Sequence, residues 1–271
     1  MYADDTVIYC SGANPKEIKK ALQEDLERVV TWMEINQLVL NKEKTKGMLF
    51  GTRQRLEAVA NFYITISGTN VEMVSKFTYL GVTLDEELKW KAHAEDVHKK
   101  VSKRLGLLRR IRSSLTVQAA QAVYKCIIEP IFSYADTAWG ELPESSITSL
   151  QRLQNRAAKI VTCQKSIRTA RNIVNWPDLE TLRKIHKCIL VYKCLRNFVP
   201  IYLKNYFKVN NDVHNYNTRQ RRNIHPNKTN LVLGGRTFKN SGRLAFNSLP
   251  SKIKEASSLA IFKRLLKGHF I

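Results

Sequence analysis

Between Trp90 and Arg112 the sequence is compatible with one kind of structure, an amphipathic helix. Side chains that suit a core recur there at spacings of three and four residues and so share one face: His93, Val97, Val101, Leu105, Leu108 and Ile111. The rest of this stretch is rich in bases, with no acid between Asp96 and Glu129: Lys99, Lys100, Lys103, Arg104, Arg109, Arg110 and Arg112. We expect the helix to bury one face in a helical domain and to present cations on the other.

The charge of the whole chain points toward a polyanionic partner. Its 271 residues hold 45 Lys and Arg against 23 Asp and Glu, a formal net charge of +22. Residues 1–150 hold 20 bases and 19 acids, whereas residues 151–271 hold 25 bases and 4 acids. Such a field attracts nucleic acid and releases counterions when phosphates bind. We expect contact that is independent of base sequence, because Lys and Arg on a smooth helix meet the phosphate backbone; the alternative is a solvated helix face.

The five cysteines are odd in number and scattered, which favours reduced thiols over a disulfide framework. His186, Cys188 and Cys194 lack the paired spacing of a zinc site, so we predict buried helix thiols. No apolar run is long enough to span a membrane, and the N-terminus does not resemble a signal peptide. We therefore expect a soluble intracellular protein, in the nucleus or the cytoplasm, whose 44% apolar residues can fill a core.

The residue pattern changes in kind near residue 85, which predicts an α+β fold. Before it, a helix should begin at Pro15 behind an Asn14 cap and end near Asn36. Strand patterns flank that helix at 6–10, 39–40, 47–50, 63–67, 71–74 and 77–84. After it, helices are predicted over 116–132, 147–161, 179–196 and 259–267, with a long basic loop over 205–236.

Three segments near the start carry a resemblance to a known family. Tyr-Ala-Asp-Asp at 2–5 resembles motif C of reverse transcriptases, whose acids hold divalent ions. The stretch from Trp32 through the basic run at 42–46 to Phe50 looks like motif D of the non-LTR retrotransposon enzymes. Phe-Thr-Tyr-Leu-Gly-Val-Thr-Leu-Asp at 77–85 is similar to their motif E, the primer-grip hairpin. The order and spacing of the three motifs make the match specific.

Weaker similarities extend the resemblance over nearly the whole chain. Residues 133–140 and 150–157 resemble the helical C-terminal region of the family, and Phe-Asn-Ser-Leu-Pro at 246–250 resembles its closing stretch. Tyr-Ala-Asp at 134–136 imitates the first motif, but it follows a helix and precedes Trp139, so we interpret it as structural.

The resemblance implies an RNA-directed DNA polymerase, a nucleotidyltransferase that uses Mg²⁺, RNA template and DNA primer or target. Residues 1–85 would be a palm remnant, 86–140 thumb-like helices and 141–271 a basic helical C-terminal region. Asp4 and Asp5 would bind metal and Lys44 would donate a proton to the leaving pyrophosphate, although Lys42 and Lys46 compete for that role. We expect nucleic acid to contact Tyr79, Leu80, Gly81 and the seven bases from Lys99 to Arg112.

Non-functional roles remain as alternatives for these residues. Asp4 could be a solvated terminal acid, Lys44 a surface lysine, and the residues at 79–81 ordinary strand positions. The family's motif A aspartate, motif B and fingers precede motif C, and an endonuclease can lie further upstream, so we expect a fragment that is inactive alone. A non-catalytic RNA- or DNA-binding module and a non-functional relic are the alternatives.

Overall fold

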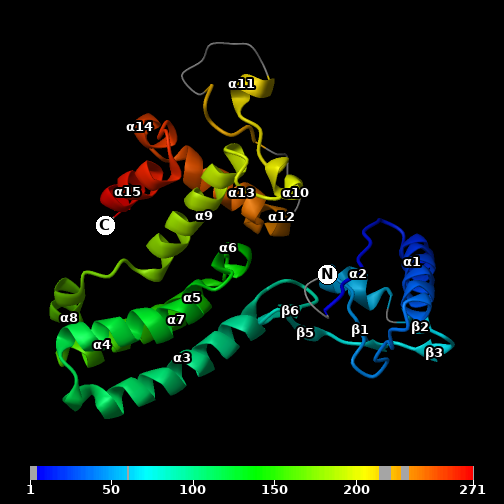
Figure 1. Ribbon diagram of the computed structural model, residues 1–271, viewed down its shortest axis with the longest axis horizontal. Coiled ribbons are helices and arrows are strands. Elements are labelled where there is room, and N and C mark those ends of the chain that lie inside the picture. Colours follow the sequence, from blue (N-terminus) through cyan, green and yellow to red (C-terminus); the bar gives the residue numbers. More distant parts are fainter. Residues whose placement is uncertain (1–4, 60, 214–220, 227–231, 271) are drawn as a thin grey trace. The chain divides into compact units, whose positions relative to one another are not determined.

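The computed structural model describes residues 5–59, 61–213, 221–226 and 232–270 (Figure 1). The chain divides into two compact units, residues 1–92 and residues 93–271. The described residues of unit 1 form three two-stranded sheets and two helices, and those of unit 2 are mainly helical. The predicted α+β class is therefore confirmed. None of the described helices combines the length and the apolarity that crossing a bilayer requires.

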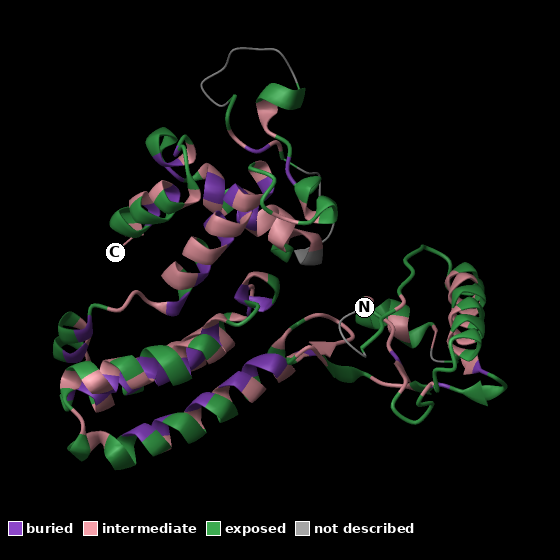
Figure 2. Ribbon diagram, in the orientation of Figure 1, coloured by how far each residue is buried: buried purple, intermediate pink, exposed green. Residues whose placement is uncertain are grey.

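Helix α1 (Pro15–Ile35) forms as predicted, with Asn14 accepting a hydrogen bond from the Lys16 amide and Asn36 at its C-terminal end. Its apolar face is at most half-buried, as the absence of buried colour on α1 in Figure 2 shows. The side-chain amide of Gln23 attaches the helix to strand β2 (Thr65–Ile66) by bonding to both backbone groups of Thr65, as a neighbouring strand would. The Gln23 amide donates to the Thr65 carbonyl at 3.0 Å and accepts from the Thr65 amide at 3.1 Å.

The sheets of unit 1 are short. Strand β1 (Lys46–Gly47) pairs in parallel with β4 (Glu72–Met73), and β2 (Thr65–Ile66) pairs antiparallel with β3 (Thr69–Asn70). Helix α2 (Arg53–Glu57) separates the first two strands. The strands predicted at 6–10 and 39–40 are wrong: no strand forms there, and the side chains of Tyr9 and Val39 are 87% and 94% exposed. A β-prone stretch becomes a strand only where a neighbour supplies backbone partners.

Residues 76–85 form a hairpin rather than the single strand that their periodicity predicted. Strand β5 (Lys76–Tyr79) pairs antiparallel with β6 (Val82–Asp85), with Tyr79 opposite Val82. The hairpin implied by the family resemblance is therefore present.

In unit 2 the predicted helices are confirmed with small changes of bounds. In chain order the first elements are α3 (Lys91–Ile111), the 3₁₀ turn η1 (Arg112–Ser114), α4 (Val117–Val123), the π-helical turn η2 (Tyr124–Ile128), α5 (Glu129–Ser133), α6 (Asp136–Trp139), α7 (Glu144–Thr162), α8 (Ile167–Val174) and α9 (Leu179–Leu195). The π-helical turn lies just before Pro130, which has no amide hydrogen to continue a regular ladder. Thr116 and Asp178 cap their helices with side-chain oxygens.

The C-terminal part is more structured than the predicted basic loop. It contains α10 (Ile201–Lys204), α11 (Asn210–Val213), α12 (Val232–Arg236), α13 (Phe238–Asn247), α14 (Ser251–Lys254) and α15 (Leu259–Phe270). The loop prediction over 205–236 is thus wrong for α11, for α12 and for Val209 and Ile224, which form a β-bridge. Helix α13 was not predicted, and Gly242 within it has a low helix propensity. That glycine lets α13 approach α9: a Cβ there would lie 2.9 Å from Phe238 and 3.0 Å from Val191.

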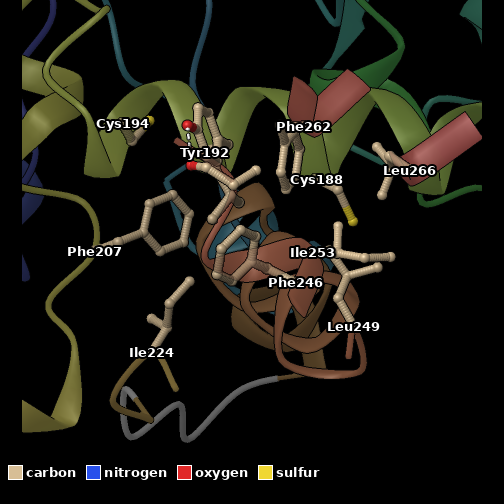
Figure 3. Packing of buried hydrophobic residues seen from close by; sticks show 12 residues of the cluster. Cys188, Tyr192, Cys194, Phe207, Ile224, Phe246, Leu249, Ile253, Phe262 and Leu266 are labelled. Atoms are coloured by element: carbon tan, nitrogen blue, oxygen red, sulfur yellow. Dashed lines mark hydrogen bonds between the residues drawn. The ribbon is translucent and has the colours of Figure 1, made fainter. Parts of the chain in front are cut away.

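A buried cluster joins α9, α13 and α15 (Figure 3). Tyr192 and Phe262 stack with ring centroids 4.2 Å apart, and the Tyr192 hydroxyl donates to the Ala256 carbonyl at 2.8 Å. Cys188 and Cys194 are buried here, as predicted, and burial raises the pKa of the Cys188 thiol to about 12. The buried thiol therefore stays protonated and unreactive at neutral pH.

The Tyr-Ala-Asp segment at 134–136 has a structural role, as its context predicted. Asp136 is buried, and its carboxylate lies 2.6 Å from the His186 ring on α9. This hydrogen bond raises the pKa of His186 against the opposing effect of burial. The neighbouring Arg183 guanidinium lies 5.1 Å from the Trp139 ring, and burial lowers the pKa of Arg183 despite the acids around it. These contacts of Asp136 and Trp139 with His186 and Arg183 fix α6 against α9.

Candidate functional site

Of the two acids in the first motif, the structure describes only Asp5. Asp4 lies outside the described residues, and Asp5 is exposed. Within the described part of the chain, no three His, Cys, Asp or Glu side chains gather closely enough to hold a metal ion. Two-metal nucleotide transfer needs several convergent carboxylates. The described residues therefore do not fit a complete Mg²⁺ site.

Lys44 lies exposed in a turn that Asn41 organises. The Asn41 side chain accepts from the Lys44 amide at 3.0 Å, and the Asn41 carbonyl accepts from the Thr45 amide at 3.1 Å. Of its two competitors, Lys46 is paired with Glu72 across strands β1 and β4 at 2.5 Å. Lys42 is exposed like Lys44. The structure therefore leaves Lys44 and Lys42 with ammonium groups that face solvent.

Tyr79, Leu80 and Gly81 form the tip of the β5–β6 hairpin. Leu80 and Gly81 both have positive φ, 46° and 78°, as a two-residue type I′ turn requires. Glycine adopts this conformation without cost, whereas leucine costs about 1–2 kcal/mol because its Cβ approaches the following carbonyl. The turn therefore contains a strained residue at a position implied to contact the primer.

Asp85 connects the hairpin to the loop that precedes α3. Its carboxylate accepts from the Lys89 and Trp90 amides, each at 2.8 Å, and its carbonyl accepts from Leu88. Leu88 and Trp90 have positive φ, so these bonds hold a strained loop in place. The last residue of the third motif thus determines how the chain leaves the hairpin.

Helix α3 buries the predicted stripe, with His93, Val97, Val101, Leu105 and Leu108 all inside unit 2. Ile111, the last member of the stripe, is 40% exposed because the helix ends there. Six of the seven bases are exposed: Lys99, Lys100, Lys103, Arg104, Arg109 and Arg110. Lys99, Lys103 and Arg110, spaced by four and seven residues, form one line along the outer face. That line is a cationic ridge about 16 Å long, interrupted between Lys103 and Arg110 by the half-exposed Leu107.

Arg112 differs from the other six bases because its guanidinium is engaged inside unit 2. Its Nε donates to the Ile160 and Val161 carbonyls at 3.1 and 2.9 Å, and its Nη1 donates to the Leu115 carbonyl at 2.6 Å. The acceptors on α7 include carbonyls near the C-terminal end of that helix, where a cation is favoured. Arg112 therefore tethers α3 to α7.

Comparison with known proteins addresses the motifs of unit 1 directly. Residues 1–84 match the family model described as reverse transcriptase (RNA-dependent DNA polymerase). The Drosophila melanogaster protein named "Probable RNA-directed DNA polymerase from transposon BS" is 30% identical over 164 residues, 59% of this chain. The chain is related to the reverse transcriptases of non-LTR retrotransposons.

Two further relatives extend the similarity. The RNA-directed DNA polymerase from mobile element jockey of Drosophila melanogaster is 24% identical over 86% of this chain. The R1 retrotransposable element Pol polyprotein of Nasonia vitripennis is 29% identical over 52% of it. These matches span 18% of the BS protein, 23% of the jockey protein and 36% of the R1 protein. No solved structure matches the chain.

The motif match assigns Asp5, Lys44 and the hairpin tip to three separate segments of unit 1, and the basic ridge belongs to unit 2. Sequence reasoning missed one further feature, a cavity of about 640 Å³ within unit 2 with basic and apolar walls. The residues that line it lie as far apart in the sequence as Leu195 and Glu255, so no local sequence pattern predicts the cavity. The one local signal was the run of bases that ends at Arg222.

Proposed function

We propose that this chain takes part in RNA-directed DNA synthesis as the portion of a polymerase that carries motifs C, D and E and a basic nucleic-acid-binding helix. The match of residues 1–84 to the reverse transcriptase family carries the proposal. In this assignment residues 1–85 are palm, 86–140 thumb and 141–271 a basic C-terminal region. RNA template and DNA primer or target are the proposed partners. A DNA target favours the nucleus as the site of activity, with the cytoplasm as the alternative.

We further propose that the chain alone does not extend a primer. Two-metal transfer needs several convergent carboxylates, so Asp4 and Asp5 need a carboxylate from another segment to hold two ions. Asp5 is exposed, and the described residues offer no such cluster. Unit 1 also presents large apolar side chains to solvent, among them Trp32, Ile35 and Val39. A further protein layer that covers them and contributes the missing acid would complete the site.

Primer extension tests both parts. The purified chain is mixed with RNA template, DNA primer, nucleotides and Mg²⁺, and no extended product is expected. Fusion to the upstream polymerase portion of the jockey relative should restore extension, and Asp4→Asn with Asp5→Asn should abolish it. Glu24→Gln with Asp25→Asn, which removes two exposed acids of α1, is the matched control and should leave extension unchanged.

Two results would count against the proposal. Processive synthesis by the chain alone would show that the carboxylate site is complete. Extension by the fused enzyme that survives loss of both Asp4 and Asp5 would remove these acids from catalysis.

A non-catalytic nucleic-acid-binding module is the second candidate, and the exposed ridge of α3 favours it. Six exposed bases lie in a stretch that contains no acid from 97 to 128, more than solubility alone requires. The affinity of the chain for an RNA–DNA hybrid should fall steeply between about 50 and 200 mM salt, because bound phosphates release counterions. A flat salt titration would exclude this function.

A further inference from the structure

The cavity of unit 2 lies between the C-terminal end of α9, the paired segments around Val209 and Arg221, and helices α13 and α14. Its volume of about 640 Å³ is within the range of small-ligand sites. All of its walls belong to unit 2, so its shape is set by that unit alone.

The walls combine two chemistries. Four lining side chains are cationic, Arg196, Arg221, Arg222 and Lys254, against a single acid, Glu255. The remaining lining is largely apolar and includes the buried Phe246 at the edge of the core. An excess of guanidinium groups beside an apolar wall suits a ligand that is anionic at one end and flat and apolar at the other.

The cations are held by the fold. Lys254 donates to the Asn223 side chain at 2.9 Å and to the Asn247 carbonyl at 2.7 Å, and Arg196 donates to the Ala256 carbonyl at 3.2 Å. Arg222 forms an ion pair with Glu255. Arg196 and Arg222 use few of the five N–H donors of a guanidinium in these contacts, so hydrogen-bonding capacity remains at the cavity.

The segment that carries Arg221 and Arg222 is anchored by Asn247. The Asn247 side chain accepts from the Ile224 amide at 2.8 Å and donates to the Ile224 carbonyl at 3.0 Å, while the Ile224 side chain is buried in the cluster of Figure 3. Backbone bonds from Asn210 to Asn223 and from Asn211 to Arg221 align the two paired segments. The Phe-Asn-Ser-Leu-Pro stretch at 246–250 thus supplies both the apolar floor and the anchor.

We propose that this cavity binds a nucleotide unit of an unpaired nucleic-acid strand, with the phosphate at Arg221 and Arg222 and the base against the apolar wall. The choice of a nucleic acid over another polyanion rests on the proposed function. The cavity is a second site, distinct from the ridge of α3, and would hold a single strand while the ridge holds the duplex. Glu255 opposes binding by neutralising Arg222, and the strand phosphate replaces it as the partner of that guanidinium.

Binding of a fluorescent 12-nucleotide single strand by the full chain tests the proposal. Arg221→Ala with Arg222→Ala should weaken binding about tenfold and reduce the slope of log affinity against log salt by about 0.7, because one phosphate contact is lost. Glu255→Gln should strengthen binding about threefold, because it removes the opposing charge. Lys263→Ala with Arg264→Ala, two exposed bases of α15, is the control of equal charge and should change affinity by less than about twofold.

Crosslinking and competition experiments distinguish a nucleic-acid strand from other anionic ligands. A crosslink from a 4-thiouridine strand should map to the cavity segments, and an excess of nucleoside monophosphate should prevent it if the cavity accepts free nucleotides as well as strands. Equal competition by poly-glutamate would replace the nucleotide with a general polyanion and overturn the assignment, as would equal affinities of the cavity and α15 variants. Lys103→Ala with Arg110→Ala, two bases of the ridge, should weaken hybrid binding and spare the crosslink, so a failure of the ridge is distinguishable from a failure of the cavity.

Discussion

Leu80 adopts a backbone conformation that leucine rarely takes, at the tip of the only motif whose hairpin is complete within the described residues. Leu80→Asn should relieve this conformation and raise the free energy of unfolding by about 1 kcal/mol. Gly81→Ala should act in the opposite sense, because alanine tolerates a φ of 78° poorly. Urea denaturation followed by circular dichroism measures both. If Leu80→Asn is stabilising yet lowers primer affinity, the strained leucine is retained for contact with nucleic acid.

The Asp136–His186 pair makes stability depend on pH. The hydrogen bond to Asp136 raises the folded-state pKa of His186, so its contribution is fully present below about pH 6.5 and is lost as the pH rises through the folded pKa. Burial lowers the folded-state pKa of His93, so the contribution of His93 has the opposite sign: it destabilises the folded protein as the pH falls below about 6.5. We expect the melting temperature to fall as the pH rises above about 6.5, and Asp136→Asn to flatten that fall. An unchanged slope in the Asp136→Asn protein would remove the pair from this dependence.

Along helix α3 we predict that the exposed bases bind nucleic acid, whereas Arg112 at its end tethers the helix to α7. Lys99→Ala, Lys103→Ala and Arg110→Ala together should reduce the salt slope for an RNA–DNA hybrid by about 2.7 with little loss of stability, because all three are exposed. Arg112→Ala should instead lower the melting temperature, since it leaves carbonyls of α7 without their donor. Fluorescence anisotropy and thermal melting distinguish the two classes. Equal effects of Arg112→Ala and the triple variant on hybrid affinity would contradict this division.

The elements also show which structures sequence can predict. Helices with local signals were found, because the cap at Asn14, Thr116 or Asp178 and the apolar spacing lie within the same segment. The strands at 6–10 and 39–40 were not, because a strand depends on a partner that sequence does not reveal. The candidate site shows the same division. The order of the motifs predicted the hairpin and made Lys44 a candidate, whereas the tether of Arg112 and the cavity at Arg222 arise from contacts between distant segments.

At the scale of the whole molecule the two units differ in how much core they have. Among the described residues of unit 1, Ile66 and Val71 are the buried apolar side chains, whereas unit 2 buries large side chains such as Trp139, Tyr192 and Phe262. Burial of apolar surface is the main source of stability, so unit 1 should open at a lower free energy than unit 2.

Hydrogen–deuterium exchange on the full chain measures this difference. The amides of α1 should exchange within minutes at neutral pH, because the helix has no buried residue, while those of α9 should stay protected for hours. Addition of the upstream polymerase portion of the jockey relative should slow exchange in α1 and leave α9 unchanged, if the proposed layer covers the exposed apolar side chains of unit 1. If α1 is already as protected as α9 in the chain alone, unit 1 is complete without another layer and the proposed need for one is wrong.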